Sequence, residues 1–210
     1  MPLRELFSEI IGGFSGKIAF WALVFMAINN IGTGIYDVLF NKFFIEELSW
    51  TGEQIGSARP WGLWIGGGVG LLVGLGVSRY GARYLLLGFI TAELFLYLFL
   101  GMIDGPITKN QGFLILVGVE IATVGSQVIM FALLMSLCVT RTSATNFGIY
   151  MGLSNLSTLM GSKIAPISFA ALGYSGSFIL SAAVLIPCLL IIPVLTSSDK
   201  RRLSLSLQSD

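Results

Sequence analysis

The chain has 210 residues, of which 55% are hydrophobic and 11% are charged, and its mean hydropathy is +0.86. Soluble domains carry about 25% charged residues, so this composition excludes a soluble domain and a disordered chain. The net charge of +1 excludes a nucleic-acid-binding module, which would be strongly basic. Histidine is absent and the two cysteines, Cys138 and Cys188, lie in apolar runs, so we expect no metal, no cofactor and no enzymatic activity.

Residues 1–17 precede the first long apolar stretch and predict a short amphipathic helix. Its apolar residues recur at helical spacing and are Leu3, Leu6, Phe7, Ile10, Ile11 and Phe14. A secretory signal would be more continuously apolar and would end in a cleavage site of small residues. We therefore expect a helix that lies on the cytoplasmic surface of the membrane.

Residues 18–195 contain six stretches that match the roughly 20 apolar residues needed to cross a bilayer core about 30 Å thick. They are Ile18–Phe40, Trp61–Val77, Tyr84–Ile103, Gly112–Cys138, Asn146–Leu172 and Ser175–Leu195. The Ser-rich and charged residues 196–210 predict a flexible cytoplasmic tail. The sequence therefore predicts an all-α membrane protein with a bundle of six transmembrane helices.

Basic residues are unevenly distributed between the two ends of these spans. Eight fall on the side of the termini and are Arg4, Lys17, Arg79, Arg83, Arg141, Lys200, Arg201 and Arg202. Three fall on the other side and are Lys42, Arg59 and Lys109, whereas Lys163 lies within a span. The positive-inside rule then predicts that both termini are cytoplasmic, and we expect a bacterial inner membrane.

Two ionisable residues of opposite charge lie in consecutive spans. Such a residue at the centre of a transmembrane helix costs at least about 2.5–3.5 kcal/mol, so each needs a role. From a rise of about 1.5 Å per residue, Glu120 in the fourth span and Lys163 in the fifth lie at similar depth. One hypothesis is a gated ion pair in which Glu120 takes up a coupling proton. The alternative is a static pair, or a Lys163 side chain that extends to the outer surface.

The six spans divide into two sets of three, which suggests an inverted repeat of three plus three helices. The segment Gly74-Leu-Gly-Val-Ser-Arg-Tyr-Gly-Ala-Arg83, between the second and third spans, resembles the loop motif of the major facilitator superfamily of transporters. Ser78 stands where that family carries Asp. The resemblance implies half of a major facilitator fold. It also implies a gating loop at the cytoplasmic side formed by Gly74, Arg79, Gly81 and Arg83.

Further segments resemble the second half of the muropeptide-permease (AmpG-type) branch, which also includes acetyl-coenzyme A transporters. They are Pro2-Leu-Arg-Glu-Leu-Phe7, Leu133-Leu-Met-Ser-Leu-Cys138 and Ser143-Ala-Thr-Asn-Phe147. The resemblance covers nearly the whole chain. Family members carry Lys, Asp and Arg where this chain has Asn30, Thr33 and Thr158, and Glu120 retains an acidic residue to within one position. The resemblance therefore implies the fold, whereas the loss of these charges means that it does not imply the substrate.

Four amide side chains lie inside the spans and are Asn29, Asn30, Gln127 and Asn155. In the resembled fold their helices line the central cavity, which implies that these amides bind a small polar solute. The alternative is that they form hydrogen bonds between helices, worth about 0.6 kcal/mol each.

Two further acidic residues have less certain surroundings. Glu93 lies mid-span in the third helix, which is peripheral in the resembled fold and would face lipid or a neighbour. The two alternatives for Glu93 are a protonated carboxyl group and a contact with a partner subunit. Asp37, near the outer end of the first span, is interpreted as an exposed residue at the mouth of the bundle.

Glycines form two stripes at a spacing of four residues. The second span carries Gly62, Gly66, Gly70 and Gly74, and the fifth span carries Gly148 and Gly152. Such stripes allow another helix to approach backbone to backbone. In the resembled fold these two helices contact the other half of the transporter, and the alternative is packing within this half.

We expect one half of a proton-coupled symporter that moves a small polar solute, a muropeptide-like sugar or another amphiphilic metabolite, by alternating access. Because the site of such a transporter forms between two halves, the expected partner is a second copy of this chain or a separately encoded first half. The alternatives are a non-transporting membrane scaffold or assembly protein, and an inactive fragment of a twelve-span transporter.

Overall fold

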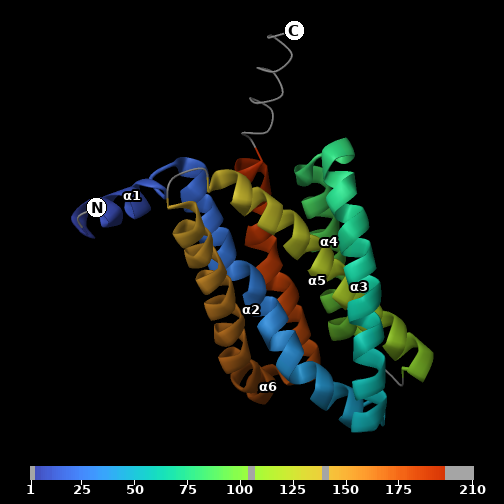
Figure 1. The fold of residues 1–210 in the computed structure, drawn as a ribbon. Coiled ribbons are helices and arrows are strands. Elements are labelled where there is room, and N and C mark those ends of the chain that lie inside the picture. The colour runs from blue at the N-terminus through green and yellow to red at the C-terminus, as the bar shows by residue number, and fades with distance from the viewer. Residues whose placement is uncertain (1–2, 104–106, 139–141, 197–210) are drawn as a thin grey trace.

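The computed structural model describes residues 3–103, 107–138 and 142–196, and within these ranges the chain is helical with no strand (Figure 1). The helices are α1 (Leu3–Gly12), α2 (Lys17–Glu46), α3 (Gly52–Tyr80), α4 (Ala82–Met102), α5 (Lys109–Leu137) and α6 (Ser143–Leu195). Five of the described helices, α2 to α6, are long and apolar enough to cross a membrane. The expectation of an all-helical fold is therefore confirmed for the described residues, and the length and apolar composition of these helices are consistent with a membrane protein.

Helix α6 contains the fifth and sixth predicted spans, which meet at a sharp turn at Gly173. This residue has φ 67° and ψ −165°, a conformation that glycine adopts far more readily than other residues. Residues 143–172 form the first segment of α6 and residues 174–195 form the second, and the two run in opposite directions (Figure 1). Beside the turn, the Tyr174 hydroxyl donates a 2.5 Å hydrogen bond to Glu46 at the end of α2.

Helix α2 packs against both segments of α6 through contacts that leave no room for a side chain. A Cβ at Gly32 would lie 2.7 Å from the backbone oxygen of Ser181 on the second segment. A Cβ at Gly34 would collide with the backbone oxygen of Thr158 on the first segment, and one at Gly161 would lie 3.0 Å from Gly34 Cα. This close approach is typical of small residues in membrane helices, and it holds α2 between the two segments.

Helices α3 and α5 form a second closely packed pair. A Cβ at Gly62 would lie 3.0 Å from Cγ of Glu120, and one at Gly66 would lie 3.3 Å from the backbone oxygen of the same residue. A Cβ at Gly70 would lie 3.3 Å from Cγ2 of Val128. These three glycines therefore pack against α5 of the same chain.

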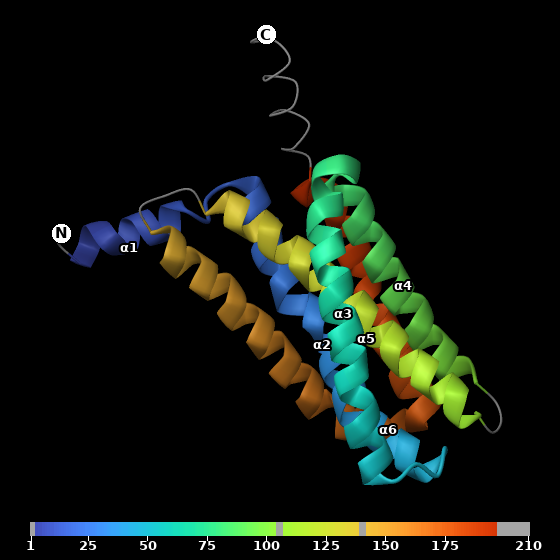
Figure 2. The same cartoon turned by 45° about the vertical axis from the view of Figure 1, so that its right-hand side comes forward.

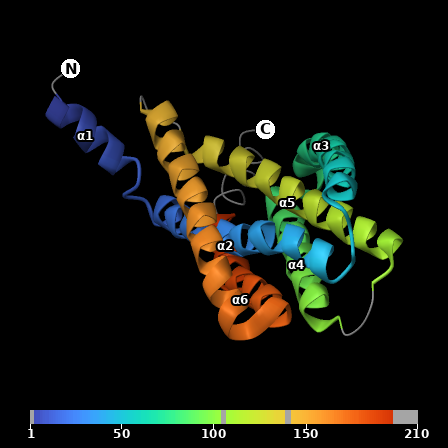
Figure 3. The same ribbon diagram turned by 90° about the horizontal axis from the view of Figure 1, so that it is seen from below.

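The other glycines of the predicted stripes face open space. No atom lies within 4 Å of a Cβ built at Gly74 on α3, or at Gly148 and Gly152 on the first segment of α6. These two helices lie on opposite sides of the bundle when it is seen along its length (Figure 3). Three glycines of the stripes therefore pack within the chain, and the other three lie on open faces of α3 and α6.

Helix α4 connects the α2–α6 group to the α3–α5 pair (Figure 2). On one side, a Cβ at Gly125 of α5 would lie 2.5 Å from the Phe89 ring of α4. On the other side, a Cβ at Gly101 of α4 would lie 2.9 Å from the backbone oxygen of Ser175 on α6. Direct contacts between α2 and either α3 or α5 are few, so α4 carries most of the packing between the two groups.

Helix α3 begins at Gly52, nine residues before the predicted span at Trp61. The Thr51 hydroxyl accepts a hydrogen bond from the Gln54 backbone N–H, and the Gln54 side chain accepts one from the Thr51 N–H. This capping box starts the helix in a segment that the apolar pattern assigned to a loop. Thr108 and Gln111 form the same motif before α5. As a result, Arg59 lies within α3 instead of outside the spans.

The N-terminal helix forms as expected and extends sideways from one end of the bundle (Figure 1). Its side chains Phe7 and Ile11 are exposed, and after it Phe14 packs its ring 5.3 Å from that of Tyr150. Its position on the membrane surface stays a prediction. The predicted tail, beyond Thr196, and Arg141 lie outside the described residues.

The substitution Gly161→Ala is expected to lower the free energy of unfolding by about 1–3 kcal/mol, because the added methyl group would collide with the α2 backbone. Gly152→Ala in the same segment is the matched control, since open space surrounds that position. Titration of the purified protein from mild detergent into sodium dodecyl sulfate measures both. Equal stability of the two variants would contradict the close approach of α2 and α6.

Candidate functional site

Three charged side chains from three helices meet near the end of the bundle that contains Gly173. The Arg59 Nη2 of α3 lies 2.9 Å from Oδ1 of Asp37 on α2, and its Nε lies 3.6 Å from Oε1 of Glu120 on α5. We call these residues the Arg59 cluster. From a rise of about 1.5 Å per residue, each lies about 10–17 Å inside the nearer end of its helix. The cluster links α2 to both helices of the α3–α5 pair.

The Arg59 cluster is partly open. The side chains of Arg59 and Asp37 are 39% and 40% exposed, and that of Glu120 is 17% exposed. Charged groups within a bilayer core are too costly to face lipid. In a membrane, the Arg59 cluster would therefore need water or another protein beside it. Two carboxylates share one guanidinium, so the cluster carries one net negative charge when all three groups are ionised.

The expected ion pair between Glu120 and Lys163 is not formed between these two described residues. Helix α5 packs against α3 and makes few contacts with α6, so Glu120 faces Arg59 instead. Lys163 is exposed on the first segment of α6. The prediction of similar depth used only distance along each helix, whereas an ion pair also needs the two side chains to point toward each other. Arg59 was missed because its segment was assigned to a loop.

The predicted amide side chains do not gather in one place. Asn29 donates a 2.9 Å hydrogen bond to Asn30, which donates one of 2.6 Å to the Ser154 hydroxyl on α6. Both asparagines are buried, so this contact is the interhelical alternative considered above. Asn155 is exposed on the next position of α6, and Gln127 is half-buried on α5. Ser154 was not predicted, because a serine in a helix carries no signal of its partner.

Glu93 lies inside the bundle and not against lipid, which corrects the expectation for this residue. Its side chain is 2% exposed. Its Oε1 accepts hydrogen bonds from Thr33 Oγ1 at 3.1 Å, Tyr97 Oη at 2.9 Å and Thr123 Oγ1 at 3.5 Å. These donors belong to α2, α4 and α5. The cause is the position of α4, which packs between the two helix groups and turns this face inward.

Of the predicted gating residues, Gly81 alone forms the turn between α3 and α4, whereas Gly74 and Arg79 lie in α3 and Arg83 lies in the first turn of α4. Gly81 ends α3 with φ 81°, and its N–H donates a 3.0 Å hydrogen bond to the Val77 backbone oxygen. A left-handed φ of this kind favours glycine. Arg79 is exposed and lies 5.6 Å from the centre of the Tyr80 ring, and Arg83 starts α4. The gating role of this turn stays a prediction.

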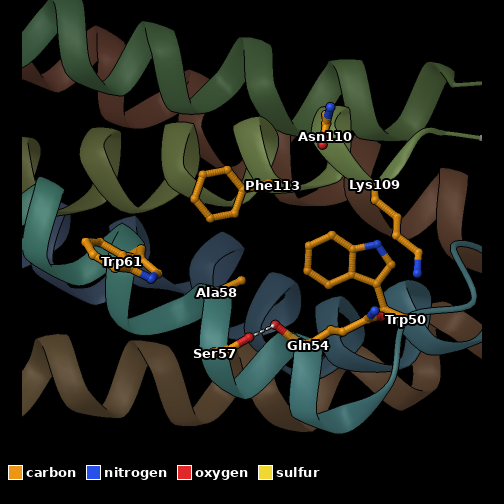
Figure 4. Close-up of a pocket in the computed structure, with 8 residues that line it drawn as sticks. All are labelled: Trp50, Gln54, Ser57, Ala58, Trp61, Lys109, Asn110 and Phe113. Carbon is orange, nitrogen blue, oxygen red and sulfur yellow. Dashed lines mark hydrogen bonds between the residues drawn. The ribbon is translucent and has the colours of Figure 1, made fainter.

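A pocket of about 370 Å³ lies between the first turns of α3 and those of α5 (Figure 4). Three aromatic rings and several polar groups line it, and its residues are Trp50, Gln54, Ser57, Ala58, Trp61, Lys109, Asn110 and Phe113. The Trp50 indole N–H is buried and has no hydrogen-bond partner among the described residues. The volume lies in the range of small-molecule sites. The pocket adjoins Arg59 along α3 and was not predicted, because its residues come from two segments far apart in sequence.

A scan against models of protein families gives no match for this chain, and a comparison with curated proteins gives none either. The resemblance to major facilitator transporters and to their AmpG-type branch therefore stays a prediction.

The hydrogen bond between Asn30 and Ser154 is open to a double-mutant cycle. Asn30→Ala and Ser154→Ala are expected to show a coupling of about 0.6 kcal/mol in the free energy of unfolding, the average for such bonds in membrane helices. Asn155→Ala is the control, since that side chain is exposed, and it should show no coupling to Ser154→Ala. Additive losses for Asn30 and Ser154 would contradict the contact.

Proposed function

We propose that this chain is one six-helix half of a proton-coupled secondary transporter that moves a small polar solute by alternating access. The observation that carries the proposal is the Arg59 cluster. It brings together three partly exposed ionisable groups from three apolar helices, and in a membrane such groups are too costly to face lipid. In membrane proteins such groups mark solute pathways and proton relays. A water-filled cavity beside the cluster, closed by a second helix bundle, accounts for their partial exposure.

The way the helices pair supports the assignment to a repeat of three plus three helices. Helix α2 packs against the first segment of α6, and α5 packs against α3. The first helix of each set of three therefore packs against the second helix of the other set. Both pairs use glycines for close approach. A pseudo-two-fold axis between the two sets of three helices accounts for this cross-pairing, as in transporters built from inverted repeats.

Two open faces support a second bundle as the partner. On α3, a hollow of about 730 Å³ is lined by Pro60, Leu63, Trp64, Gly67, Gly68 and Leu71. Trp64 is 79% exposed there. The first segment of α6 presents Gly148 and Gly152 to open space. Small residues beside large apolar ones suit helix packing in a membrane. The partner is a second copy of this chain or a separately encoded first half.

In this proposal Glu120 takes up the coupling proton. Protonation removes its charge and weakens its contact with Arg59, which then interacts with Asp37 alone. Because Asp37 belongs to α2 and Glu120 to α5, the change shifts the balance of attraction between the two helix groups. The bundle then rocks against its partner around the solute site. The aromatic pocket at Trp50 lies beside this cluster and supplies a place for the solute to enter.

A non-transporting membrane scaffold is the second candidate. The hydrogen bonds that join Asn29, Asn30 and Ser154 favour it, because amides bonded to each other are less available to a solute. The exposed apolar face of α3 would serve a scaffold equally well. The charged cluster favours the transporter, since a scaffold does not need it.

The mass of the protein in lipid nanodiscs tests whether a second bundle is present. We expect a complex of twice the 22.6 kDa of one chain, or a stable complex with another six-span protein, because the cavity needs two halves. A species that stays monomeric at all protein-to-lipid ratios would leave the cluster open on one side. That result would favour the scaffold.

The substitution Glu120→Gln is expected to abolish solute-dependent proton uptake, because the amide cannot take up the proton. Lys163→Gln is the matched control and should retain most of the uptake, since Lys163 makes no ion pair with Glu120. Uptake is measured in proteoliposomes with an enclosed pH-sensitive dye and a panel of amino sugars, short peptides and nucleosides. Full uptake by Glu120→Gln, or none by the wild-type complex, would overturn the proposal.

A further inference from the structure

The buried carboxyl group of Glu93 has surroundings that the proposed function does not use. Three hydroxyl groups from three helices donate to its Oε1, and no ion pair involves it among the described residues. A buried charge without a cation is unfavourable in a membrane. We propose that Glu93 is a second proton-binding site, connected to the Arg59 cluster along α2 and α5. This inference rests on the proposed function for its use in coupling.

The position of the hydroxyl groups connects the two sites. On α2, Thr33 lies four residues before Asp37, and on α5, Thr123 lies three residues after Glu120. Residues at these spacings share one face of a helix. Thr33 and Thr123 therefore contact Glu93 one helical turn further from the end of the bundle that holds the cluster. Polar groups thus continue from the open cluster to the buried carboxyl group.

The hydrogen bonds suit both states of the carboxyl group. In the protonated state the proton is on Oε2, and Oε1 is a carbonyl oxygen that accepts from the hydroxyls. In the ionised state the same hydroxyls stabilise the negative charge. When Glu93 takes up a proton from Glu120, the O–H bond of Glu120 breaks and an O–H bond forms on Oε2 of Glu93. The number of protons and the total charge are unchanged by this step.

Several other ionisable groups surround Glu93. Tyr97 on α4 donates to it, and the ring of Tyr36 on α2 lies 5.3 Å from that of Tyr97. Asp37 on α2 and Cys188 on α6 also interact with it electrostatically. Arg59 is the cation of this region, and it is held by Asp37 and Glu120. A proton is therefore the ligand that neutralises Glu93 without drawing Arg59 out of the cluster.

Infrared difference spectroscopy of the full chain in lipid vesicles tests the proposal. A carbonyl band of a protonated carboxyl group is expected at low pH, and it should disappear as the pH rises. The measurement is made with the Glu120→Gln variant, so that Glu120 contributes no carbonyl band, and the additional substitution Glu93→Gln should then remove the band. Because that variant also changes the packing, Thr33→Val provides a second test with the carboxyl group retained. It removes one donor to Oε1 and should shift the band to higher frequency.

The control for Thr33→Val is Thr158→Val, whose hydroxyl donates to the Ser154 backbone oxygen and not to Glu93, and its band should stay unshifted. A band that persists in Glu93→Gln, or that is constant at every pH at which the protein stays folded, would overturn the proposal. So would a band that appears only when sodium is removed, which would identify a sodium site. A band that titrates while solute-dependent proton uptake is absent would retain this site and reject the proposed function.

Discussion

The backbone contact between α2 and the two segments of α6 is the constraint on which the rest of the bundle depends. Without side chains at Gly34 and Gly161, the two helices approach closely enough for Asn30 to bond Ser154 at 2.6 Å. The same approach fixes the rotation of α2 about its axis. The neighbouring positions Thr33 and Asp37 then contact Glu93 of α4 and Arg59 of α3. The positions of both acidic sites thus follow from where glycine occurs.

Acidic side chains lie at two levels of this bundle, one open and one buried, and different groups stabilise them at each level. At the open level, two carboxylates share one guanidinium and all three side chains are partly exposed. At the buried level, neutral hydroxyl groups surround a single acid. This division agrees with the cost of burying ions, because an ion pair retains its advantage only where it is partly solvated or fully hydrogen-bonded. Helix α4 makes the buried level possible, since it carries Glu93 and Tyr97 into the space between the two helix groups.

The helices themselves are predictable from the sequence, because long apolar runs satisfy the length that a bilayer requires. The start of α3 is also encoded locally, in Thr51 and Gln54, but hydropathy alone overlooks it. Contacts between side chains of different helices are not predictable in the same way. The hydroxyls that bind Glu93 lie 30 and 60 residues away from it, and threonines are too common to indicate a partner. Likewise, depth along a helix does not specify direction around it, so Glu120 was paired with the wrong cation.

The turn at Gly173 has a consequence for how the protein enters the membrane. It leaves no loop between the two segments of α6, and Tyr174 beside it is bonded to the end of α2. The first segment carries an exposed lysine and an exposed asparagine, which oppose its insertion as a single helix. The second segment is more apolar and free of charged residues. We therefore expect the two segments to insert as one helical hairpin, in which the second segment compensates for the polar residues of the first.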